Sequence, residues 1–393
     1  MILFTLFFDF TMKAVKAGIV YTGRVELVLK DVYIVFNDEG VITNVRREKP
    51  SVEVVGEAPV VTPAFIDAHS HIGMVRAGEH PSEEESNEHM DSVLATVDAL
   101  DSIYMDDQSF KESIEHGVLY SCVLPGSGNV IGGKGVVIKN YAQTTRDAFI
   151  KYAGVKAALG FNPRSTTDWK GTRPFTRMGA IAILRKALLK ARNELKLVEK
   201  GKKEVEEVEP EVSALFPILK GELKLRVHVH KADDIMALLR LREEFNLKVV
   251  VDHACDIHRK EIFEILAKEN IPIVYGPVDA FSYKTELKHE SWRNIKKLVE
   301  AKPFYGLMTD HPVILQRNLF LQLRFFRRFG VSREECINII TERNAKILGI
   351  DDKYGVIEKG KMASLVLWNG DPFSLETYPV KVLAEGKIIY EEE

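Results

Sequence analysis

The sequence predicts an α/β protein whose main body is a (β/α)8 TIM-like barrel. The first observation is a recurring short apolar run that ends in a histidine or an aspartate. The second is that stretches with helical character, at 233–246 and 259–270, lie between these runs. Strands that alternate with helices of this length form parallel sheets. The polar residues that end such strands meet at one face of a barrel, where barrel enzymes keep their chemistry.

The first apolar run covers 60–66 and leads into Asp67, His69 and His71. Residues i and i+2 of a strand point to the same face, so both imidazoles point the same way. Two imidazoles at this spacing can bind one metal ion, with zinc and its first-row neighbours preferred. Asp67 shares their parity and could orient an imidazole from behind.

Three later apolar runs end in the same kinds of residue. The run within 225–230 ends in His228 and His230, and the run within 247–253 ends in Asp252 and His253. The run within 304–312 ends in Asp310 and His311. His228 and His230 share parity, so either could be the ligand from that strand. The residue pattern therefore predicts a metal centre at the C-terminal ends of the barrel strands.

The segment PAFIDAHSHIG at 63–73, the strand-end His228 and His253, and TDHP at 309–312 resemble the amidohydrolase superfamily. The similarity is closest to the imidazolonepropionase-related branch, which also holds prolidase-like enzymes, and it covers the chain from about Met12 to the end. The resemblance implies a metal-dependent barrel that hydrolyses the C–N bond of an amide, a cyclic amide or a dipeptide-like substrate. An ester is a further substrate that the resemblance allows. The alternative is a catalytically silent barrel of the same fold that serves binding or assembly.

The resemblance also implies roles for particular residues. The expected ligands of one or two divalent ions, zinc above all, are His69, His71, His228, His253 and Asp310. Asp310 and His253 are expected to be catalytic. Asp310 is expected to accept a proton from water and to pass it to the leaving nitrogen. Contacts to the ligands or to the substrate are expected from His230, Asp67, His311, Arg173 and Arg177, because guanidinium groups grip carboxylates.

Many members of the superfamily bridge two ions through a carboxylated lysine or a glutamate on the third or fourth strand. The matching strand is predicted at 155–163, and its end carries Phe161 and Asn162 instead of an acid. The candidates for a bridging lysine are Lys156, near the start of this predicted strand, and Lys139 in the preceding apolar run. We expect both lysines to be structural and the protein to hold one ion tightly.

Short strands flank the barrel on both sides. They are predicted at 16–21, 25–36 and 41–46, with a hairpin turn at 37–40, and again at 363–368 and in a hairpin over 380–390. Neither group is large enough to be stable alone. Together, 12–61 and 350–393 are expected to form a small β-sandwich domain beside the barrel at 62–349, with 1–11 as an N-terminal extension.

Composition restricts the partners. The net charge of −3 argues against a nucleic-acid or anionic-membrane partner, which leaves a small-molecule substrate and a possible homo-oligomer. Three widely spaced cysteines fit a reducing, cytoplasmic setting. The glycine-rich segment 126–135 is not a nucleotide loop, because its Lys134 is followed by Gly135 instead of Ser or Thr. The charged stretch 190–211 is expected to be a solvated helix.

Overall fold

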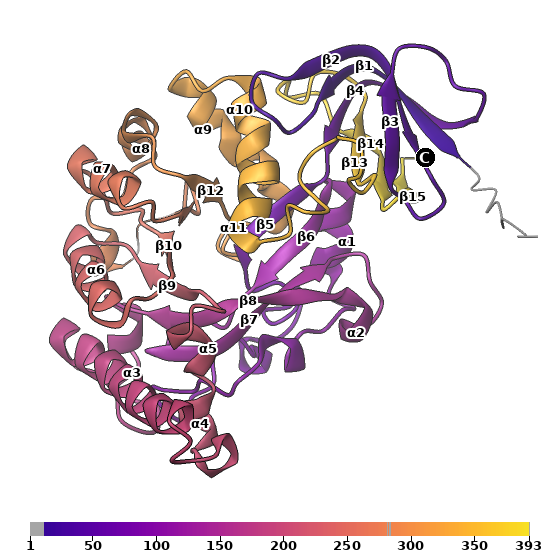
Figure 1. The fold of residues 1–393 in the computed structure, drawn as a ribbon. Helices are drawn as coiled ribbons and strands as arrows, with labels where there is room; N and C mark the ends of the chain where they lie inside the picture. The colour runs from indigo at the N-terminus through magenta and orange to yellow at the C-terminus, as the bar shows by residue number, and fades with distance from the viewer. Residues whose placement is uncertain (1–11, 281, 283, 393) are drawn as a thin grey trace, which may run out of the picture.

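The computed structural model describes residues 12–280, 282 and 284–392, and its strands form two sheets (Figure 1). The first sheet has eight strands in the order β12-β11-β10-β9-β8-β7-β6-β5. Their bounds are β5 Phe65–Ser70, β6 Val118–Val123, β7 Ile131–Lys139, β8 Phe149–Ala158, β9 Leu225–Val229, β10 Val249–His253, β11 Ile273–Tyr275 and β12 Tyr305–Leu307.

This sheet curves into the predicted barrel, with one departure. Strand β7 runs antiparallel to both of its neighbours, β6 and β8, whereas every other pair in the sheet is parallel. The reason is the length of its connections, at 124–130 and 140–148. A parallel crossover needs about a dozen residues or more, whereas antiparallel neighbours can be joined by a short loop.

The barrel nearly closes between its first and last strands. No ladder joins β5 to β12, but Asp310 N donates to His69 O at 3.1 Å and His71 N donates to His311 O at 3.1 Å. Thr309 N also donates to the Asp67 carboxylate at 3.1 Å. These bonds bring the segment after β12 against the end of β5, so the two ends of the sheet share one site.

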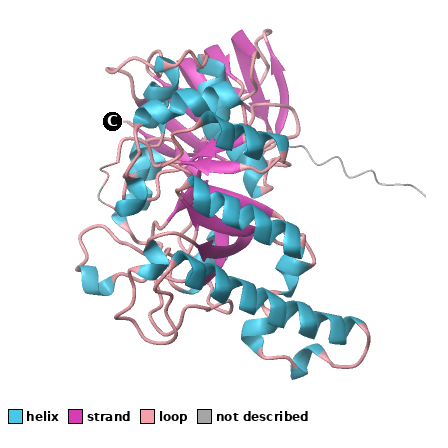
Figure 2. Cartoon of the chain, turned by 90° about the vertical axis from the view of Figure 1, so that its left-hand side faces the viewer, coloured by secondary structure: helices cyan, strands magenta, loops and turns pink. Residues whose placement is uncertain are grey.

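Helices cover the outside of the barrel (Figure 2). The α-helices are α1 Gln108–Glu115, α2 Thr145–Ala148, α3 Arg177–Glu199, α4 Pro210–Ser213, α5 Phe216–Leu219, α6 Ala232–Phe245, α7 Lys260–Lys268, α8 Ile295–Ala301, α9 Leu323–Arg328, α10 Arg333–Asn338 and α11 Asn344–Leu348. Helices α6 and α7 match the two predicted helices within three residues at each end. None of the helices in the described ranges is long and apolar enough to cross a membrane.

The second sheet joins both ends of the described chain. Its seven strands run in the order β15-β14-β13-β4-β1-β2-β3. Their bounds are β1 Lys13–Tyr21, β2 Val28–Phe36, β3 Ile42–Arg46, β4 Glu53–Pro63, β13 Leu365–Trp368, β14 Pro379–Ala384 and β15 Lys387–Glu391. The flanking strands thus pair in space as expected, in one hydrogen-bonded sheet; their arrangement as a sandwich stays a prediction. The extension predicted at 1–11 lies outside the described residues.

Two boundaries differ from the sequence prediction. The apolar run at 60–66 is divided between the end of β4 and the start of β5, with Ala64 between them. The strand predicted at 155–163 is β8, which lies at 149–158. Gly160 adopts a positive φ of 85° just after this strand, a conformation that leaves extended structure. The correction moves Lys156 from the start of the strand to its C-terminal end.

Candidate metal centre

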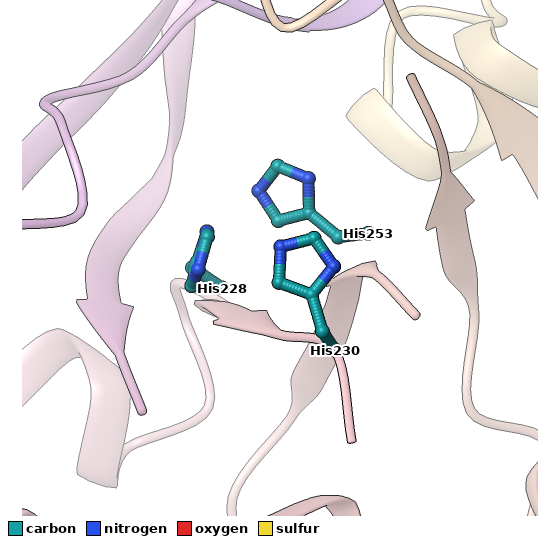
Figure 3. A group of neighbouring side chains, drawn as sticks. All are labelled: His228, His230 and His253. Carbon is teal, nitrogen blue, oxygen red and sulfur yellow. The ribbon is translucent and has the colours of Figure 1, made fainter. Parts of the chain in front are cut away.

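Five histidines gather at the C-terminal ends of β5, β9 and β10. His69 lies in β5 and His71 follows it, with their ring centroids 5.3 Å apart. The rings of His69 and His253 are 4.9 Å apart, which links β5 to β10. His228, His230 and His253 lie together on the other side of the cluster (Figure 3). The centroids of their rings are 4.3 to 4.8 Å apart.

These side chains form two overlapping sets of donors. One set is His228, His230 and His253, and the other is His69, His253 and Asp310; within each, one donor atom per residue lies within 4.8 Å of the others. The Asp310 carboxylate lies 3.4 Å from His69 Nε2 and 3.2 Å from His71 Nε2. The arrangement thus brings together all five residues that were expected to bind metal.

The ring nitrogens show which atoms are available for a ligand. His71 Nδ1 lies 2.7 Å from Leu124 O, and His253 Nδ1 lies 2.9 Å from Gly276 O. A carbonyl contact of this kind places the proton on Nδ1 and leaves Nε2 as the free donor. His253 Nε2, His228 Nδ1 and His230 Nδ1 are buried without a hydrogen-bond partner. Buried nitrogens without partners are costly in an apolar interior, and a metal ion would satisfy them.

The imidazoles are also held in their neutral form. Burial lowers the pKa of His69 and of His230 to about 4, and it lowers the pKa of His228 and His253 well below the ordinary value. Burial disfavours the charged imidazolium, and metal ligation requires the neutral ring. These four imidazoles are therefore in their ligating state at neutral pH.

Asp310 is the acidic member of the cluster. Burial alone would raise the pKa of its carboxyl, but the imidazoles of His253, His71 and His69 hold that pKa well below its usual range. The backbone is left-handed at Asp310, with a φ of 51°, and at His253, with a φ of 79°. Positive φ values at residues other than glycine are strained and concentrate at functional sites. Here they turn both side chains toward the cluster.

Lys156 lies in the same cluster, because it is near the C-terminal end of β8 and not near the strand start, where the sequence prediction places it. Its ammonium nitrogen is 3.3 Å from His69 Nε2 and donates to Pro125 O at 3.0 Å. The side chain is fully buried, and burial lowers its pKa to about 8. No carboxylate within 4 Å pairs with it among the described ion pairs. A buried amine beside the ligands is the position expected of a bridging lysine.

Lys139, the other bridging candidate, lies away from the cluster. Because β7 runs antiparallel, Lys139 ends its strand at the opposite end of the barrel from the strand-end ligands, and its nitrogen is 3.0 Å from the Glu385 carboxylate in the terminal sheet.

The two arginines expected to anchor a substrate already bind other groups of the protein. Arg177 pairs with Asp234 at 2.6 Å, and Arg173 donates to Asn129 at 2.6 Å and to His89 O at 2.9 Å.

Asp67 does not contact an imidazole ring, contrary to one expected role. Its buried carboxylate accepts hydrogen bonds from the Thr309 hydroxyl, the Thr309 amide and Gln316 Nε2. The residue behind His69 is instead Asp252, whose carboxylate lies 3.6 Å from His69 Nδ1. Asp252 is held in turn by Arg226 at 2.6 Å, and both side chains are fully buried.

His311 and His230 have separate positions. His311 Nδ1 accepts the Gln316 backbone amide at 3.2 Å, so His311 contributes to the barrel seam. His230 Nε2 lies 3.9 Å from the Glu286 carboxylate and its ring stacks on His253. His230 is therefore in the cluster itself, beside the strand-end His228.

Glu286 is a site residue that the sequence pattern does not reveal. It lies in the turn Thr285–Leu287 between β11 and α8, yet its side chain is buried and its carboxylate is 3.4 Å from His228 Nε2. The same carboxylate accepts the Phe161 amide at 2.7 Å. A Cβ at Gly160 would come within 2.5 Å of it, so a glycine makes room for this acid. No apolar run precedes Glu286, and only the fold brings it here.

A small cavity borders the cluster at the mouth of the barrel. Its volume is about 20 Å³, and it is lined by His230, Cys255, Pro277, Ala280, Lys284, Leu287, Glu290, Asp310 and Val313. That volume holds about one water molecule. Of the five expected ligands, Asp310 is the residue that lines this cavity.

Comparison with known proteins agrees with this geometry. The model of the amidohydrolase family matches residues 187–390. An amidohydrolase structure from Thermotoga maritima is 33% identical, with a TM-score of 0.90 over 97% of this chain and 100% of that chain. The imidazolonepropionase of Picrophilus torridus is 22% identical over 89% of each chain.

The amidohydrolase tasK of Hapsidospora irregularis is 25% identical over 89% of this chain. The match covers 39% of that longer protein, so the present chain spans about two fifths of its length. The family model covers more than half of the chain and includes β9 with His228, β10 with His253, and Asp310 after β12. The chain therefore belongs to the amidohydrolase family.

Proposed function

We propose that this protein is a metal-dependent hydrolase that activates water to cleave the C–N bond of a small amide, cyclic amide or dipeptide-like substrate. The observation that carries the proposal is the gathering of buried imidazole nitrogens without partners around one carboxylate, at the strand ends of a barrel. The names of the matched relatives, two amidohydrolases and an imidazolonepropionase, support hydrolysis of this bond class.

The proposed ligands are the strand-end residues His69, His71, His228, His253 and Asp310. Zinc suits a set of neutral imidazoles with one carboxylate. The two overlapping donor sets, the first of which includes His230 as a further donor, favour two ions over one. Lys156 is the proposed bridging lysine, because addition of carbon dioxide to its neutral amine would give a carbamate that could hold a metal ion, and its nitrogen lies beside His69. This replaces the expectation of a structural lysine and a single ion.

The residues of the chain supply the remaining chemistry. A divalent ion acts as a Lewis acid and lets water ionise near neutral pH. Asp310 is ionised and open to the mouth cavity, so it can accept the proton of the attacking water and deliver it to the leaving nitrogen. Asp252 holds His69 from behind, which fixes the orientation of that ring. His230 also lines the mouth cavity, where it could contact a substrate.

We also propose a cellular compartment and a division into domains. All three cysteines are buried free thiols, which fits a reducing compartment, and we place the protein in the cytoplasm. We assign 12–61 with 350–393 to a small β-sandwich domain beside the barrel at 62–349, and we give that domain a structural role.

The test of the proposal is metal analysis of the purified protein together with a screen of amide substrates. We expect roughly one to two zinc-like ions per chain. The double substitution His69→Ala and His71→Ala should abolish both metal retention and hydrolysis, because it removes two neighbouring ligands.

The matched control replaces two exposed histidines, His80→Ala and His116→Ala, and should keep the metal and the activity of the native protein. Full metal retention in the His69/His71 variant would contradict the site. A metal-loaded protein that hydrolyses no amide, cyclic amide or dipeptide would favour the catalytically silent barrel.

A further inference from the structure

A second group of metal-binding side chains lies outside the centre described above. Asp256 and His258 follow β10, and His289 lies between β11 and α8, so the group joins two different loops at the barrel mouth. One donor atom from each residue lies within 4.8 Å of the others. The rings of His258 and His289 are 4.1 Å apart with an angle of 37° between them. No member of the group is a proposed ligand of the first centre.

The group is built around a buried carboxylate. Asp256 is 4% exposed; one of its oxygens accepts the His289 amide at 2.5 Å and the other lies 3.4 Å from His289 Nδ1. His258 Nδ1 lies 3.2 Å from Asp256 O, which places its proton on that nitrogen and leaves Nε2 free toward solvent. Two exposed imidazoles beside a fixed carboxylate are a donor set that suits zinc and its neighbours.

The surroundings favour a cation. Burial and the nearby carboxylates of Asp256 and Asp279 raise the pKa of Glu290. Asp279 is paired with Arg324 at 2.8 Å, but Asp256 has no Lys or Arg within 4 Å among the described ion pairs. A divalent ion would offset this negative charge at the surface.

We infer that Asp256, His258 and His289 form a second site for a zinc-class divalent ion, which links the segment 284–290 to the segment that follows β10. His289 lies three residues after Glu286, whose carboxylate reaches His228. Asn294 Nδ2 already ties this loop to the β10 loop by donating to His289 O at 2.8 Å and to Cys255 O at 3.3 Å. A bound ion adds a stronger link between the same two loops.

The consequence for the first centre rests on the proposed function. The linked segment carries Glu286, whose carboxylate lies 3.4 Å from His228 Nε2. An ion at the second site would therefore order the segment that lies beside one of the proposed ligands.

The test uses the zinc-loaded protein after removal of loosely bound metal, titrated with further Zn²⁺ by calorimetry. The native protein should bind one additional ion per chain. The variant His258→Ala/His289→Ala should bind it at least roughly 100-fold more weakly, since even changes to residues behind the ligands cost up to that factor. The control variant His80→Ala/His116→Ala should match the native protein.

Hydrogen exchange gives a second reading that needs no substrate. Added Zn²⁺ should slow exchange of the amides at 284–290 in the native protein and leave them unchanged in the His258/His289 variant. Equal zinc binding by the native protein and that variant, or no additional ion in the native protein, would overturn the site. Zinc binding without slower exchange would overturn the link between the two segments. None of these outcomes depends on whether a substrate is hydrolysed.

Discussion

Asp310 combines a position beside the proposed ligands with access to the mouth of the barrel. Its carboxylate lies between the rings of His69 and His71, and its side chain is 15% exposed, whereas that of His69 is fully buried. A general acid or base must reach both the attacking water and the leaving group. Of the residues in the centre, Asp310 is the carboxylate that borders the mouth cavity.

We therefore predict that Asp310→Asn lowers turnover by roughly 100-fold or more, in line with general acid–base catalysis. The amide keeps the shape of the side chain but cannot accept the proton of water. Steady-state kinetics of the metal-loaded variant measures the effect, with Asp168→Asn, at an exposed loop position, as the control. Near-native turnover in a folded, metal-loaded Asp310→Asn protein would remove the residue from the mechanism.

The second prediction at this scale concerns Lys156. Lys156→Met keeps the apolar stem and removes the nitrogen beside His69, so the metal content should fall from roughly two ions per chain to roughly one. Metal analysis with and without added bicarbonate measures this, because only the native lysine can form a carbamate. Lys139→Met is the control, since Lys139 pairs with Glu385 away from the centre. Unchanged metal content in the Lys156 variant would leave that lysine a structural role.

Residues of the centre differ in how far the sequence reveals them. His69, His71, His228, His253 and Asp310 could be predicted because each follows its own apolar run, and that is a local signal. Asp252 stands next to His253, but its partner Arg226 comes from another strand, and only the register of β9 and β10 pairs them. No local sequence pattern identifies Glu286, because it lies in the turn Thr285–Leu287 and not at the end of an apolar strand.

At the scale of elements, the placement of β8 decides how Lys156 is interpreted. The apolar residues from Val155 to Phe161 predict a strand over 155–163, but the extended segment starts at Phe149 and stops before Gly160. Its first half mixes exposed and buried residues and lacks a clear alternation, so the pattern hides it. The antiparallel course of β7 is equally hidden, because direction depends on loop length and not on strand composition.

The seam between β5 and β12 depends on one buried acid. Asp67 accepts hydrogen bonds from Thr309 and Gln316, and it thereby joins the two ends of the barrel sheet without a strand ladder. Burial raises its pKa to about 6, although these hydrogen bonds oppose the shift. The sequence places Asp67 near the histidines, but its partners come from more than 200 residues later in the chain.

We predict that Asp67→Ala destabilises the metal-free protein by about 2–5 kcal/mol, because each buried donor left without a partner costs about 1–3 kcal/mol. Urea unfolding followed by circular dichroism measures the change. Asp168→Ala, at an exposed position, should stay within about 0.5 kcal/mol of the native protein. A similarly small effect of Asp67→Ala would show that the seam does not depend on this carboxylate.

At the scale of the whole molecule, the terminal sheet and the barrel share one apolar core. Trp368 at the end of β13 packs against Phe65 of β5 and Phe320 after β12, with ring centroids 6.2 Å and 5.3 Å apart. Its indole nitrogen donates to the Thr62 hydroxyl at 3.1 Å. The terminal sheet therefore supports the strand that carries His69, even though it supplies none of the proposed ligands.

The final prediction follows from this shared core. Trp368→Ala should lower the free energy of unfolding by about 3–5 kcal/mol, the usual cost of truncating a large buried aromatic side chain. Because other buried residues of both sheets, among them Val60 and Val366, belong to the same apolar cluster, the variant should still unfold in one transition, with loss of bound metal and loss of secondary structure at the same urea concentration. Trp169→Ala, which removes a partly exposed indole stacked on His89, is the control and should cost much less. Two separate transitions in the Trp368 variant, with metal retained through the first, would show that the barrel is stable without the terminal sheet.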